Sequence, residues 1–587
     1  MTPENRNVVV AVLLSILIVV GFEWYSAKTR PPTPALPATT AQPAPPATTA
    51  QSGQPVAPGQ PQIGAPAQTP AMPGAPTPPG ATAAAAAAPA RTVPRIAVET
   101  PTLKGTVALE GARLDDLVFT QYFDQPAGKG KPERLFVPKG DKNAYYAQFG
   151  WVAVDGAAVP GPDTLWIADK STLTPDQPVT LSWDNGQGLK FALILAVDKN
   201  YVFTVTGRVV NAGAKPATLH AYGLLARSGT PHTSDIYILH EGPLGIFDKA
   251  LKETTYADLR KKGSEEQKAQ GGWAGITDKY WLAAMVPDQK ATATHRFLYR
   301  KDGAEDRYQV DYLQDATVLA PGATAESKTY LFAGAKKLGL LDDYGDKLGI
   351  PRFDLAIDFG WFYFLTKPMF YALIWLNQHL GNFGFAIMAL TVGIKLLFYP
   401  LANKSYVAMS KMKKLQPDLL KMRERFGDDK VRLNQEMMAL YKREQVNPAA
   451  GCLPILVQIP VFFALYKVLY VTIEMRHAPF FGWIVDLSAP DPTTIFNLFG
   501  LIPWTPPIFL MVGVWPLIMG VTMWFQQKMN PAPADPIQAK MFMYLPLIFT
   551  YMLASFPAGL VIYWAWNNVL SMAQQWSIMK RMGVPAT

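Results

Sequence analysis

The chain of 587 residues contains a single cysteine, Cys452, so no intramolecular disulfide can form and no covalent cross-link holds the fold. We expect Cys452, which lies in an apolar segment, to be a packing residue. The sequence also lacks a Walker A motif, a His/Cys set at metal-ligand spacing and a nucleophile elbow, and its six histidines are scattered. These absences argue against an enzyme and predict neither a metal nor a cofactor.

Acidic residues are missing from five apolar runs in the last third of the chain. The runs cover residues 384–401, 454–471, 508–525, 541–556 and 559–576, and each can cross a bilayer as a helix. A proton- or ion-coupled carrier usually needs an intramembrane carboxylate. The absence therefore weakens the hypothesis of a small-solute channel or carrier.

Large apolar residues are nearly absent from residues 31–95, which consist mostly of Pro, Ala, Thr, Gln and Gly. Such a segment cannot bury a core, so we predict a disordered Pro/Ala-rich tether. Before it, residues 1–30 hold a short apolar run that begins after Arg6 and ends near Trp24 and Tyr25. No convincing cleavage site follows, which favours an uncleaved N-terminal transmembrane anchor over the alternative, a cleaved signal peptide.

Residues 96–350 have the pattern of short β-strands. The run 201–210 is rich in β-branched and aromatic residues, and turn signals lie before it at 184–186 and after it at 211–213. Repeated strands of this kind predict a large all-β sandwich domain, which we place outside the membrane.

The positive charges predict the topology. Residues 403–450 are dense in Lys and Arg, whereas Arg476 is the only Lys or Arg in residues 472–507. Short basic loops stay in the cytoplasm, so the first loop is expected inside and the second outside. One crossing, residues 381–402, must then separate the β domain from the basic loop. A further apolar run, 359–376, cannot also cross, and we predict that residues 351–380 form an amphipathic helix on the outer membrane surface.

The fold class predicted from these segments is a polytopic α-helical membrane protein with six transmembrane helices and a large all-β sandwich domain. The crossings are the anchor, residues 381–402 and four helices within residues 451–576. Both chain ends are then cytoplasmic, and residues 577–587 form a short tail.

The basic loop itself is expected to be structured. Pro417 can occupy the first position of a helix, and two apolar stripes follow at helical spacing. The first stripe is Leu419, Met422 and Phe426, and the second is Leu433, Met437, Leu440 and Tyr441. The pattern predicts a cytoplasmic helical hairpin within residues 403–450. Its charge has two explanations, topology alone or contact with RNA, phospholipid headgroups or a nascent chain; the candidate contact residues are Lys411, Lys413, Lys414, Arg423 and Arg425.

Polar residues inside the apolar runs mark a candidate site. Lys395 lies deep in the second crossing with Thr391 one turn earlier, and an ionisable group there is expected to face protein or water. The alternative is a lysine that snorkels toward the cytoplasm near Pro400. In the last run, Tyr563, Asn567, Ser571 and Gln574 form one stripe, which Asn568 and Gln575 widen.

Gln458 and Phe462 lie one turn apart in the third crossing. Amides of this kind indicate a wet interior, with interhelical hydrogen bonding as the alternative. Lys467 falls on the opposite helix face near the outer end, and we expect it to snorkel.

Several stretches resemble a known family. They include Lys411-Met-Lys-Lys-Leu-Gln-Pro417, Asn447-Pro-Ala-Ala-Gly-Cys-Leu-Pro454, Gln458-Ile-Pro-Val-Phe462 and Phe556-Pro-Ala-Gly-Leu560. The chain resembles the YidC insertases of the YidC/Oxa/Alb family almost continuously over residues 355–580. The segments before residue 350 resemble the Gram-negative layout, in which the β domain is a periplasmic supersandwich.

The resemblance implies a hydrophilic groove that is open to the cytoplasm and to lipid. In the family an arginine of the second helix receives polar parts of the substrate, and Lys395 stands at that position here, so the charge is kept but the bidentate fork is lost. Tyr563 and Trp564 resemble the family's paired aromatic residues. The family's long basic tail is nearly absent, since only Lys580 and Arg581 follow Trp576.

The function expected from the resemblance is a membrane protein insertase and chaperone of the bacterial inner membrane, acting alone or with the Sec translocon. An assembly chaperone without insertase activity is the alternative. Nascent membrane proteins, the phospholipid bilayer, the Sec translocon, the ribosome and the signal recognition particle receptor are the candidate partners. The groove residues implied are Lys395, Thr391, Gln458, Phe462, Tyr563, Trp564, Asn567 and Ser571.

Overall fold

A computed structural model describes residues 93–233, 239–426, 429–446, 453–504, 506–507, 510–531 and 536–584. The predicted anchor, nearly all of the predicted tether and Cys452 lie outside these residues. The described residues up to Gln416 and from Val446 onward belong to one compact unit, and Pro417–Gln445 belong to another. Each unit is described by itself.

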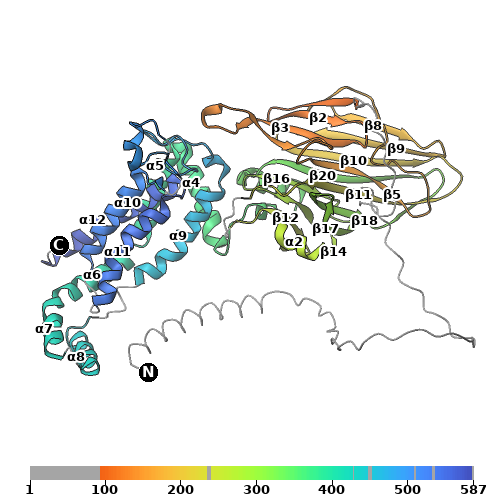
Figure 1. Cartoon of the computed structure of the whole chain (residues 1–587). Helices are drawn as coiled ribbons and strands as arrows, with labels where there is room; N and C mark the ends of the chain where they lie inside the picture. The colour runs from red at the N-terminus through yellow and green to blue at the C-terminus, as the bar shows by residue number, and fades with distance from the viewer. Residues whose placement is uncertain are drawn as a thin grey trace, which may run out of the picture. The chain divides into compact units, whose positions relative to one another are not determined.

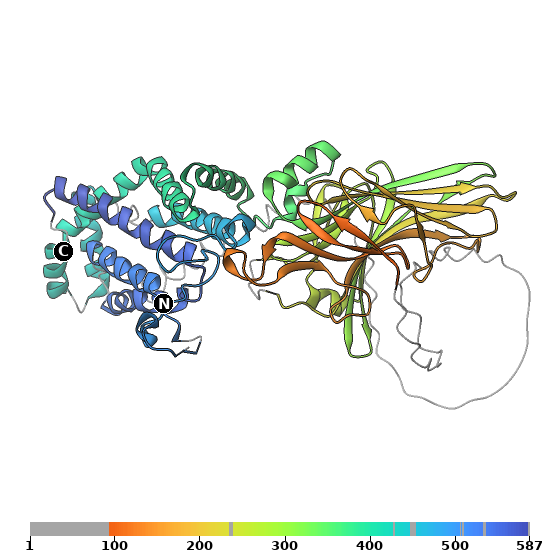
Figure 2. The same ribbon diagram turned by 90° about the horizontal axis from the view of Figure 1, so that it is seen from above.

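The first part of the larger unit is a β domain made of two sheets (Figures 1 and 2). The 11-stranded sheet contains β1 (Arg95–Glu99), β2 (Leu103–Ala108), β3 (Arg113–Phe123), β4 (Pro132–Phe136), β5 (Tyr145–Ala153), β7 (Thr172–Leu173), β11 (Ala217–Ser228), β14 (Ser264–Gln270), β17 (Thr292–Asp302), β18 (Glu305–Gln314) and β19 (Thr317–Leu319). The nine-stranded sheet contains β6 (Ile167–Ala168), β8 (Val179–Asp184), β9 (Leu189–Val197), β10 (Val202–Asn211), β12 (Gly242–Phe247), β13 (Ala250–Glu253), β15 (Trp273–Thr277), β16 (Trp281–Val286) and β20 (Thr324–Ala335). The β sandwich predicted from the sequence is confirmed.

Strand β10 shows how the sequence builds the sheet. It covers the run predicted as a strand, shifted by one residue, and pairs antiparallel with β9 and β20. The turn at Asp184–Gly186 joins β8 to β9, with Gly186 at φ +68° and its N–H donated to the Asp184 carboxylate. A whole strand, β9, therefore lies between this turn and β10, which the sequence interpretation had placed next to each other.

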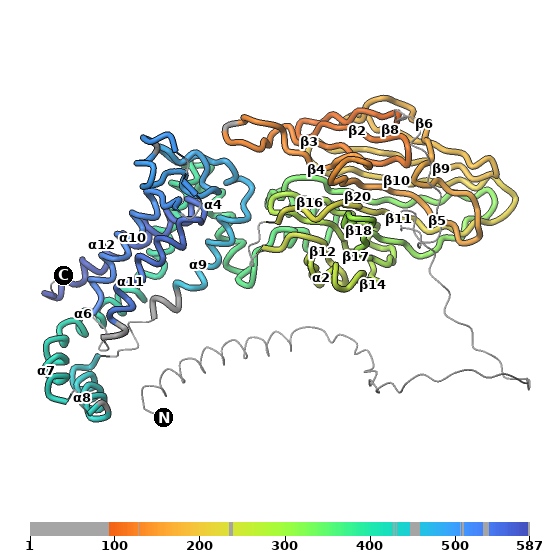
Figure 3. The backbone as a smooth tube through the Cα atoms, in the orientation of Figure 1, coloured from red at the N-terminus to blue at the C-terminus, as the bar shows by residue number. Residues whose placement is uncertain are grey.

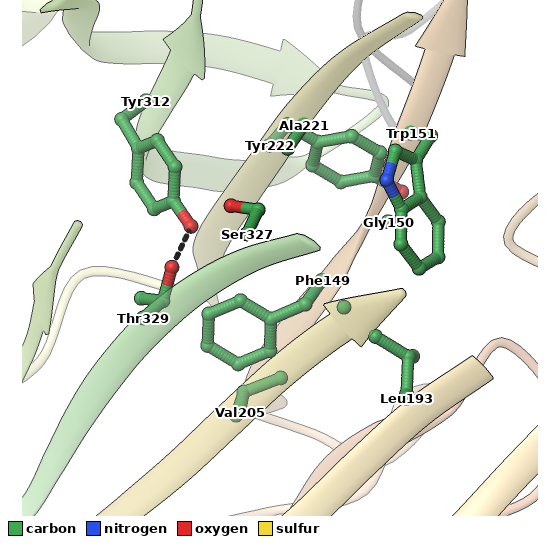
Figure 4. A pocket seen from close by; sticks show the side chains of 11 residues that line it. Phe149, Gly150, Trp151, Leu193, Val205, Ala221, Tyr222, Tyr312, Ser327 and Thr329 are labelled. Atoms are coloured by element: carbon green, nitrogen blue, oxygen red, sulfur yellow. Dashed lines mark hydrogen bonds between the residues drawn. The ribbon is translucent and has the colours of Figure 1, made fainter. Parts of the chain in front are cut away.

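The two sheets pack through large aromatic side chains. A small cavity between them is lined from both sheets, by Trp151 and Tyr312 on one side and Val205 on the other (Figure 4). The Tyr312 hydroxyl and Thr329 Oγ1 lie 2.5 Å apart across it. A Cβ on Gly207 would lie 2.7 Å from the Trp151 ring, so glycine is required for this close approach. The cavity is a feature of core packing.

The helical part of the larger unit contains α4 (Tyr363–Leu380), α5 (Phe383–Leu397), α6 (Tyr399–Lys414), α9 (Leu453–Val471), α10 (Val514–Met529), α11 (Pro536–Leu553) and α12 (Ala558–Arg581) (Figure 3). The shorter helices α2 (Tyr256–Lys262) and α3 (Leu338–Leu348) precede this part in the sequence. The 3₁₀ turns lie at Pro126–Gly128, Phe353–Ala356, Ile473–Met475 and Ile495–Gly500. Among the described residues, no single helix meets the length and apolarity needed to cross a membrane, whereas α5 and α6 together do, with a 71° bend between them.

Helix α5 ends earlier than the predicted crossing at residues 381–402. Its last residue is Leu397, and Phe398 leaves helical geometry before α6 starts. Pro400 sits in the first turn of α6, where its missing N–H costs nothing, but it could not have continued α5. The proline therefore fixes the position of the bend.

Helix α4 has two unlike faces. Thr366, Met369, Phe370 and Leu373 are buried, while large side chains on the other face, such as Trp375, are exposed. Lys367, within the apolar run, forms ion pairs with Asp342 and Asp354 at 2.9 and 2.8 Å. The exposed face is itself largely aromatic, so the amphipathic surface helix stays a prediction; the helix begins at Tyr363 rather than at residue 351.

The expectation that Lys467 snorkels is wrong. Its side chain is only 12% exposed, and Nζ lies 2.7 Å from a carboxylate oxygen of Asp358. A partner remote in the sequence neutralises this amine, which helical spacing alone could not reveal.

The smaller unit contains α8 (Lys430–Arg443) and most of α7 (Gln416–Phe426). The predicted stripe residues are all half-buried or buried, and Arg432 of α8 lies over the ring of Phe426. The two helices predicted from periodicity are therefore present. The unit begins at Pro417, however, so Lys411, Lys413 and Lys414 on α6 belong to the larger unit.

The β domain contains one histidine that makes a pH prediction possible. His295 on β17 is 1% exposed and lies between the rings of Phe247 and Tyr312. Burial lowers the pKa of His295 to about 4, whereas the unfolded chain titrates near its ordinary value. Between these values the unfolded state binds more protons, so acidification lowers the free energy of unfolding, by up to ~3 kcal/mol.

We expect His295→Leu to remove this part of the pH dependence. Urea unfolding of the full chain, followed by circular dichroism from pH 7 to pH 4, measures it. Phe297→Leu on the same strand is the control, because it should lower stability while keeping the pH slope. Identical slopes in wild type and His295→Leu would contradict the prediction.

Candidate functional site

The candidate site is built on α12. This helix contacts α5, α6, α9 and α10, so its side chains meet most of the helical part. Tyr563, Asn567 and Ser571 recur every four residues and lie along one stripe of α12. Tyr563 and Ser571 are separated by eight residues, or ~12 Å of helix rise.

The amine of Lys395 reaches this stripe near its C-terminal end. Lys395 Nζ donates a hydrogen bond to Ser571 Oγ at 2.8 Å, and Ser571 in turn donates to the carbonyl oxygen of Asn567 at 2.8 Å. The side chain of Lys395 is half-buried in the last turn of α5, where the helix dipole favours a cation. In the described part of the chain no carboxylate pairs with it. The amine thus has a hydroxyl partner but no counter-ion.

A second polar contact joins α9 to α12. Gln458 Nε2 donates to the Tyr563 hydroxyl at 2.7 Å. One turn along, the Phe462 and Trp564 rings meet edge to face with their centroids 4.9 Å apart. The structure therefore brings Gln458, Phe462, Tyr563 and Trp564 together, as expected for one site wall.

Thr391 does not join these contacts. Its side chain is buried, and its hydroxyl donates to the carbonyl oxygen of Ile387 on its own helix at 2.7 Å. Threonine commonly returns its hydroxyl to the preceding turn in this way. The role predicted for Thr391 in a groove thus stays a prediction.

The remaining amides of α12 divide between two faces. Asn568 donates to Thr522 of α10, and Gln575 donates to the Met529 carbonyl and to Asn530, each at 3.2 Å. These two side chains are buried and hold α12 against α10, so for them interhelical hydrogen bonding, the alternative left open above, is correct. Thr522 and Asn530 were not singled out, because a lone polar residue carries no periodic signal.

Gln574 behaves differently. It lies one turn from Ser571, and its amide nitrogen is enclosed without a hydrogen-bond partner among the described residues. An unpaired buried amide costs free energy, so water or another chain is the natural partner. Within the described ranges, no group of His, Cys, Asp or Glu side chains is placed to hold a metal ion.

The cationic residues predicted for the hairpin lie on two helices. Lys411 and Lys414 are exposed on α6, where Lys413 is half-buried and burial lowers its pKa. Arg423 and Arg425 are exposed on α7. The exposed side chains of Lys411, Lys414, Arg423 and Arg425 are accessible to anionic partners.

The Gln458–Tyr563 hydrogen bond gives a test of how the site is held. Gln458→Leu and Tyr563→Phe should each destabilise the helical part, and the double variant should cost less than the sum. The expected coupling is ~0.6 kcal/mol, typical of side-chain hydrogen bonds between membrane helices. Reversible unfolding in mixed detergent micelles measures the cycle, with Gln458→Leu and Asn568→Leu as the control pair. Strict additivity for Gln458 and Tyr563 would contradict a contact between them.

Comparisons with known proteins cover almost the whole chain. A family model described as the YidC periplasmic domain matches residues 95–372, and one described as 60Kd inner membrane protein matches residues 375–584. The membrane protein insertase YidC of Methylobacterium radiotolerans is 49% identical over 591 residues, covering 99% of this chain and 96% of that protein. The corresponding protein of Rhizobium etli is 48% identical over 587 residues and covers 100% and 97%.

A crystal structure described as an active YidC insertase with the first transmembrane domain resolved is 18% identical, covers 82% of this chain and 92% of its own, and has a TM-score of 0.34. The assignment rests on the family models and on the curated relatives. Because those relatives match at nearly half identity from end to end, the chain belongs to the YidC family of membrane protein insertases.

Proposed function

We propose that this protein inserts other proteins' hydrophobic segments into the bacterial inner membrane and assists their folding. The observation that carries the proposal is the amine of Lys395, which a hydroxyl contacts but no carboxylate in the described part of the chain neutralises. Around it, Asn567, Ser571 and the unpaired amide of Gln574 offer further polar groups. An uncompensated charge between helices is costly unless water or a ligand reaches it.

The mechanism follows from two opposing free energies. Moving a short polar tail of a client through hydrocarbon is unfavourable, and a groove with water and one positive charge lowers that cost. Burial of the client's apolar segment in lipid then supplies the driving free energy, at ~25 cal/mol per Å². Phe462 and Trp564 offer that segment an apolar wall as it passes. No nucleotide enters this scheme.

The proposed placement has six transmembrane helices. The anchor crosses first, α5 leads into the second crossing, and α9 to α12 supply the other four. Helix α4 then lies on the outer surface with its exposed aromatic side chains toward lipid, and the β domain is periplasmic. Both chain ends and the unit Pro417–Gln445 are cytoplasmic.

We further propose that the exposed cations of α6 and α7 contact phospholipid headgroups, a nascent chain or the ribosome. The Sec translocon and the signal recognition particle receptor are proposed as partners in the same pathway. The residues proposed for these cytoplasmic contacts are Lys411, Lys413, Lys414, Arg423 and Arg425.

The topology has a direct test. Reporter fusions placed at Lys430 should behave as cytoplasmic, whereas fusions at Arg300 or at Pro490 should behave as periplasmic. The physical reason is the density of Lys and Arg in residues 403–450. A periplasmic reporter at Lys430 would overturn the six-helix arrangement.

The charge of Lys395 predicts a dependence on the client. At an effective dielectric constant of ~20, a pair of unit charges ~4 Å apart gains ~4 kcal/mol before desolvation. Lys395→Arg should therefore support insertion, Lys395→Ala should impair clients with acidic tails more than neutral ones, and Lys395→Glu should be worst for acidic tails. Insertion into proteoliposomes, scored by protease protection of paired clients that differ only in tail charge, measures this.

Two control variants separate the effect of the Lys395 charge from the effect of its surroundings. Ser571→Ala removes the hydroxyl partner but keeps the amine, so it should leave the preference for acidic tails in place. Lys540→Ala removes an exposed lysine of α11 and should change neither client. Equal losses for both clients in Lys395→Ala would reduce Lys395 to a structural role. Solute flux without insertion would instead favour a carrier, and holding without insertion an assembly chaperone.

A further inference from the structure

The loop between α9 and α10 exposes an unusual amount of apolar surface. Residues 495–504, here called the apolar loop, include the exposed side chains of Phe496, Leu498, Phe499, Leu501 and Trp504. Leu501 is 83% exposed, which is more than any other aliphatic side chain among the exposed large hydrophobic residues described. No Asp, Glu, Lys or Arg occurs from residue 492 to residue 527. A patch of this kind on a loop marks an interaction surface.

Buried polar contacts close the base of the apolar loop. The carboxylate of Asp491 accepts hydrogen bonds from the backbone N–H of Thr493 and from that of Trp515, at the start of α10. Thr494 Oγ1 donates to the carbonyl oxygen of Leu510 at 2.7 Å. These hydrogen bonds join the segment before the apolar loop to the segment after it, so the apolar residues extend from a fixed base.

The backbone of the apolar loop satisfies many of its own donors. The N–H of Phe499 donates to the Thr494 carbonyl at 2.9 Å, that of Ile502 to the Asn497 carbonyl at 3.0 Å, and that of Trp504 to the Ile502 carbonyl at 2.8 Å. Hydrocarbon offers no partner to an unpaired backbone group, so a loop with this internal pairing is compatible with an apolar environment.

The local conformation also turns apolar side chains outward. Leu498 and Phe499 have φ of +49° and +58°, a left-handed conformation that bulky residues rarely adopt. About half of each side chain is exposed, at 54% and 51%, so packing against the rest of the chain covers these two apolar side chains only in part. A strained backbone that presents apolar side chains to the surroundings points to an external partner.

We propose that the apolar loop is inserted into the outer leaflet of the membrane, with its side chains in the boundary between headgroups and acyl chains. The inference rests on the proposed membrane placement of α9 and α10. Lipid is the occupant because the uncharged sequence continues through α10 as far as residue 527, where Val521 and Phe525 are exposed, and because α11 also exposes an apolar face. The loop then fixes the depth of the outer ends of α9 and α10.

The tryptophans agree with this depth. Trp504 lies at the end of the apolar loop, and Trp483 donates its indole N–H to the Asp491 carboxylate at the base. Indole rings favour the membrane interface, where one edge is apolar and the other polar. The loop thus has an apolar tip and an aromatic, hydrogen-bonded base.

Spin labels on the full chain in liposomes of phosphatidylethanolamine and phosphatidylglycerol test the proposal. In a Cys452→Ser background, single cysteines at Leu501, Leu547 and Val318 carry a nitroxide. Leu547 on α11 is 70% exposed and reports the proposed transmembrane surface, while Val318 on β19 is 68% exposed and reports water. Collision rates with oxygen and with a water-soluble nickel chelate are compared.

The proposal predicts an oxygen-to-nickel ratio at position 501 close to that at 547 and several-fold above that at 318. A ratio at 501 equal to that at 318, with 547 still lipid-like, would overturn the loop insertion and leave the membrane placement intact. Low collision rates with both reagents at 501 would indicate contact with a second protein copy and would also overturn it. A water-like ratio at 547 would instead refute the proposed placement itself. Leu501→Asp should raise nickel access at a label on Phe499 if the loop lies in lipid.

Discussion

The proposed site depends on one amine, that of Lys395, which has no counter-ion among the described residues. Lys395 and Lys467 both lie in strongly apolar helices, yet within the described ranges only Lys467 pairs with a carboxylate, at 2.7 Å. Lys395 has the Ser571 hydroxyl instead, which disperses its charge but does not neutralise it. Because an isolated cation is unstable in hydrocarbon, the surrounding helices must leave it accessible to water or to a partner. The proposed groove is the consequence of this constraint.

The two faces of α12 make different contacts. One face is held against α10 by hydrogen bonds from the buried amides of Asn568 and Gln575. The other face carries Tyr563, Asn567 and Ser571 and makes fewer, spaced contacts with α5 and α9. Tyr563 and Ser571 are buried by these contacts, whereas Asn567 between them is half-buried. The bend at Phe398 places Lys395 at the end of α5, because the helix stops at Leu397, two residues later.

Periodicity and composition were sufficient for much of this fold. They predicted the β sandwich, the helices α7 and α8, and the stripe on α12 that meets Lys395 and Gln458. They failed where long-range pairing decides the outcome. Asp358 is 109 residues before Lys467, so nothing local reveals that this lysine is paired. The turn at Asp184–Gly186 was recognised, but β9, which follows it, was missed because its long apolar run has little alternation. The sequence of α12 alone does not show which of its amides face α10, because that depends on how the helices pack in the tertiary structure.

The central claim is that a client's polar tail passes beside Lys395. Photocrosslinking from α12 tests this claim most directly, because it leaves the Lys395 amine intact. A photoreactive residue at Asn567 faces the proposed groove, whereas one at Val569 lies about 200° round the helix and serves as the control. During insertion, the account predicts crosslinks from position 567 to the client's tail and few or none from position 569. Insertion that proceeds with no crosslink at 567, or with equal crosslinks at both positions, would contradict it.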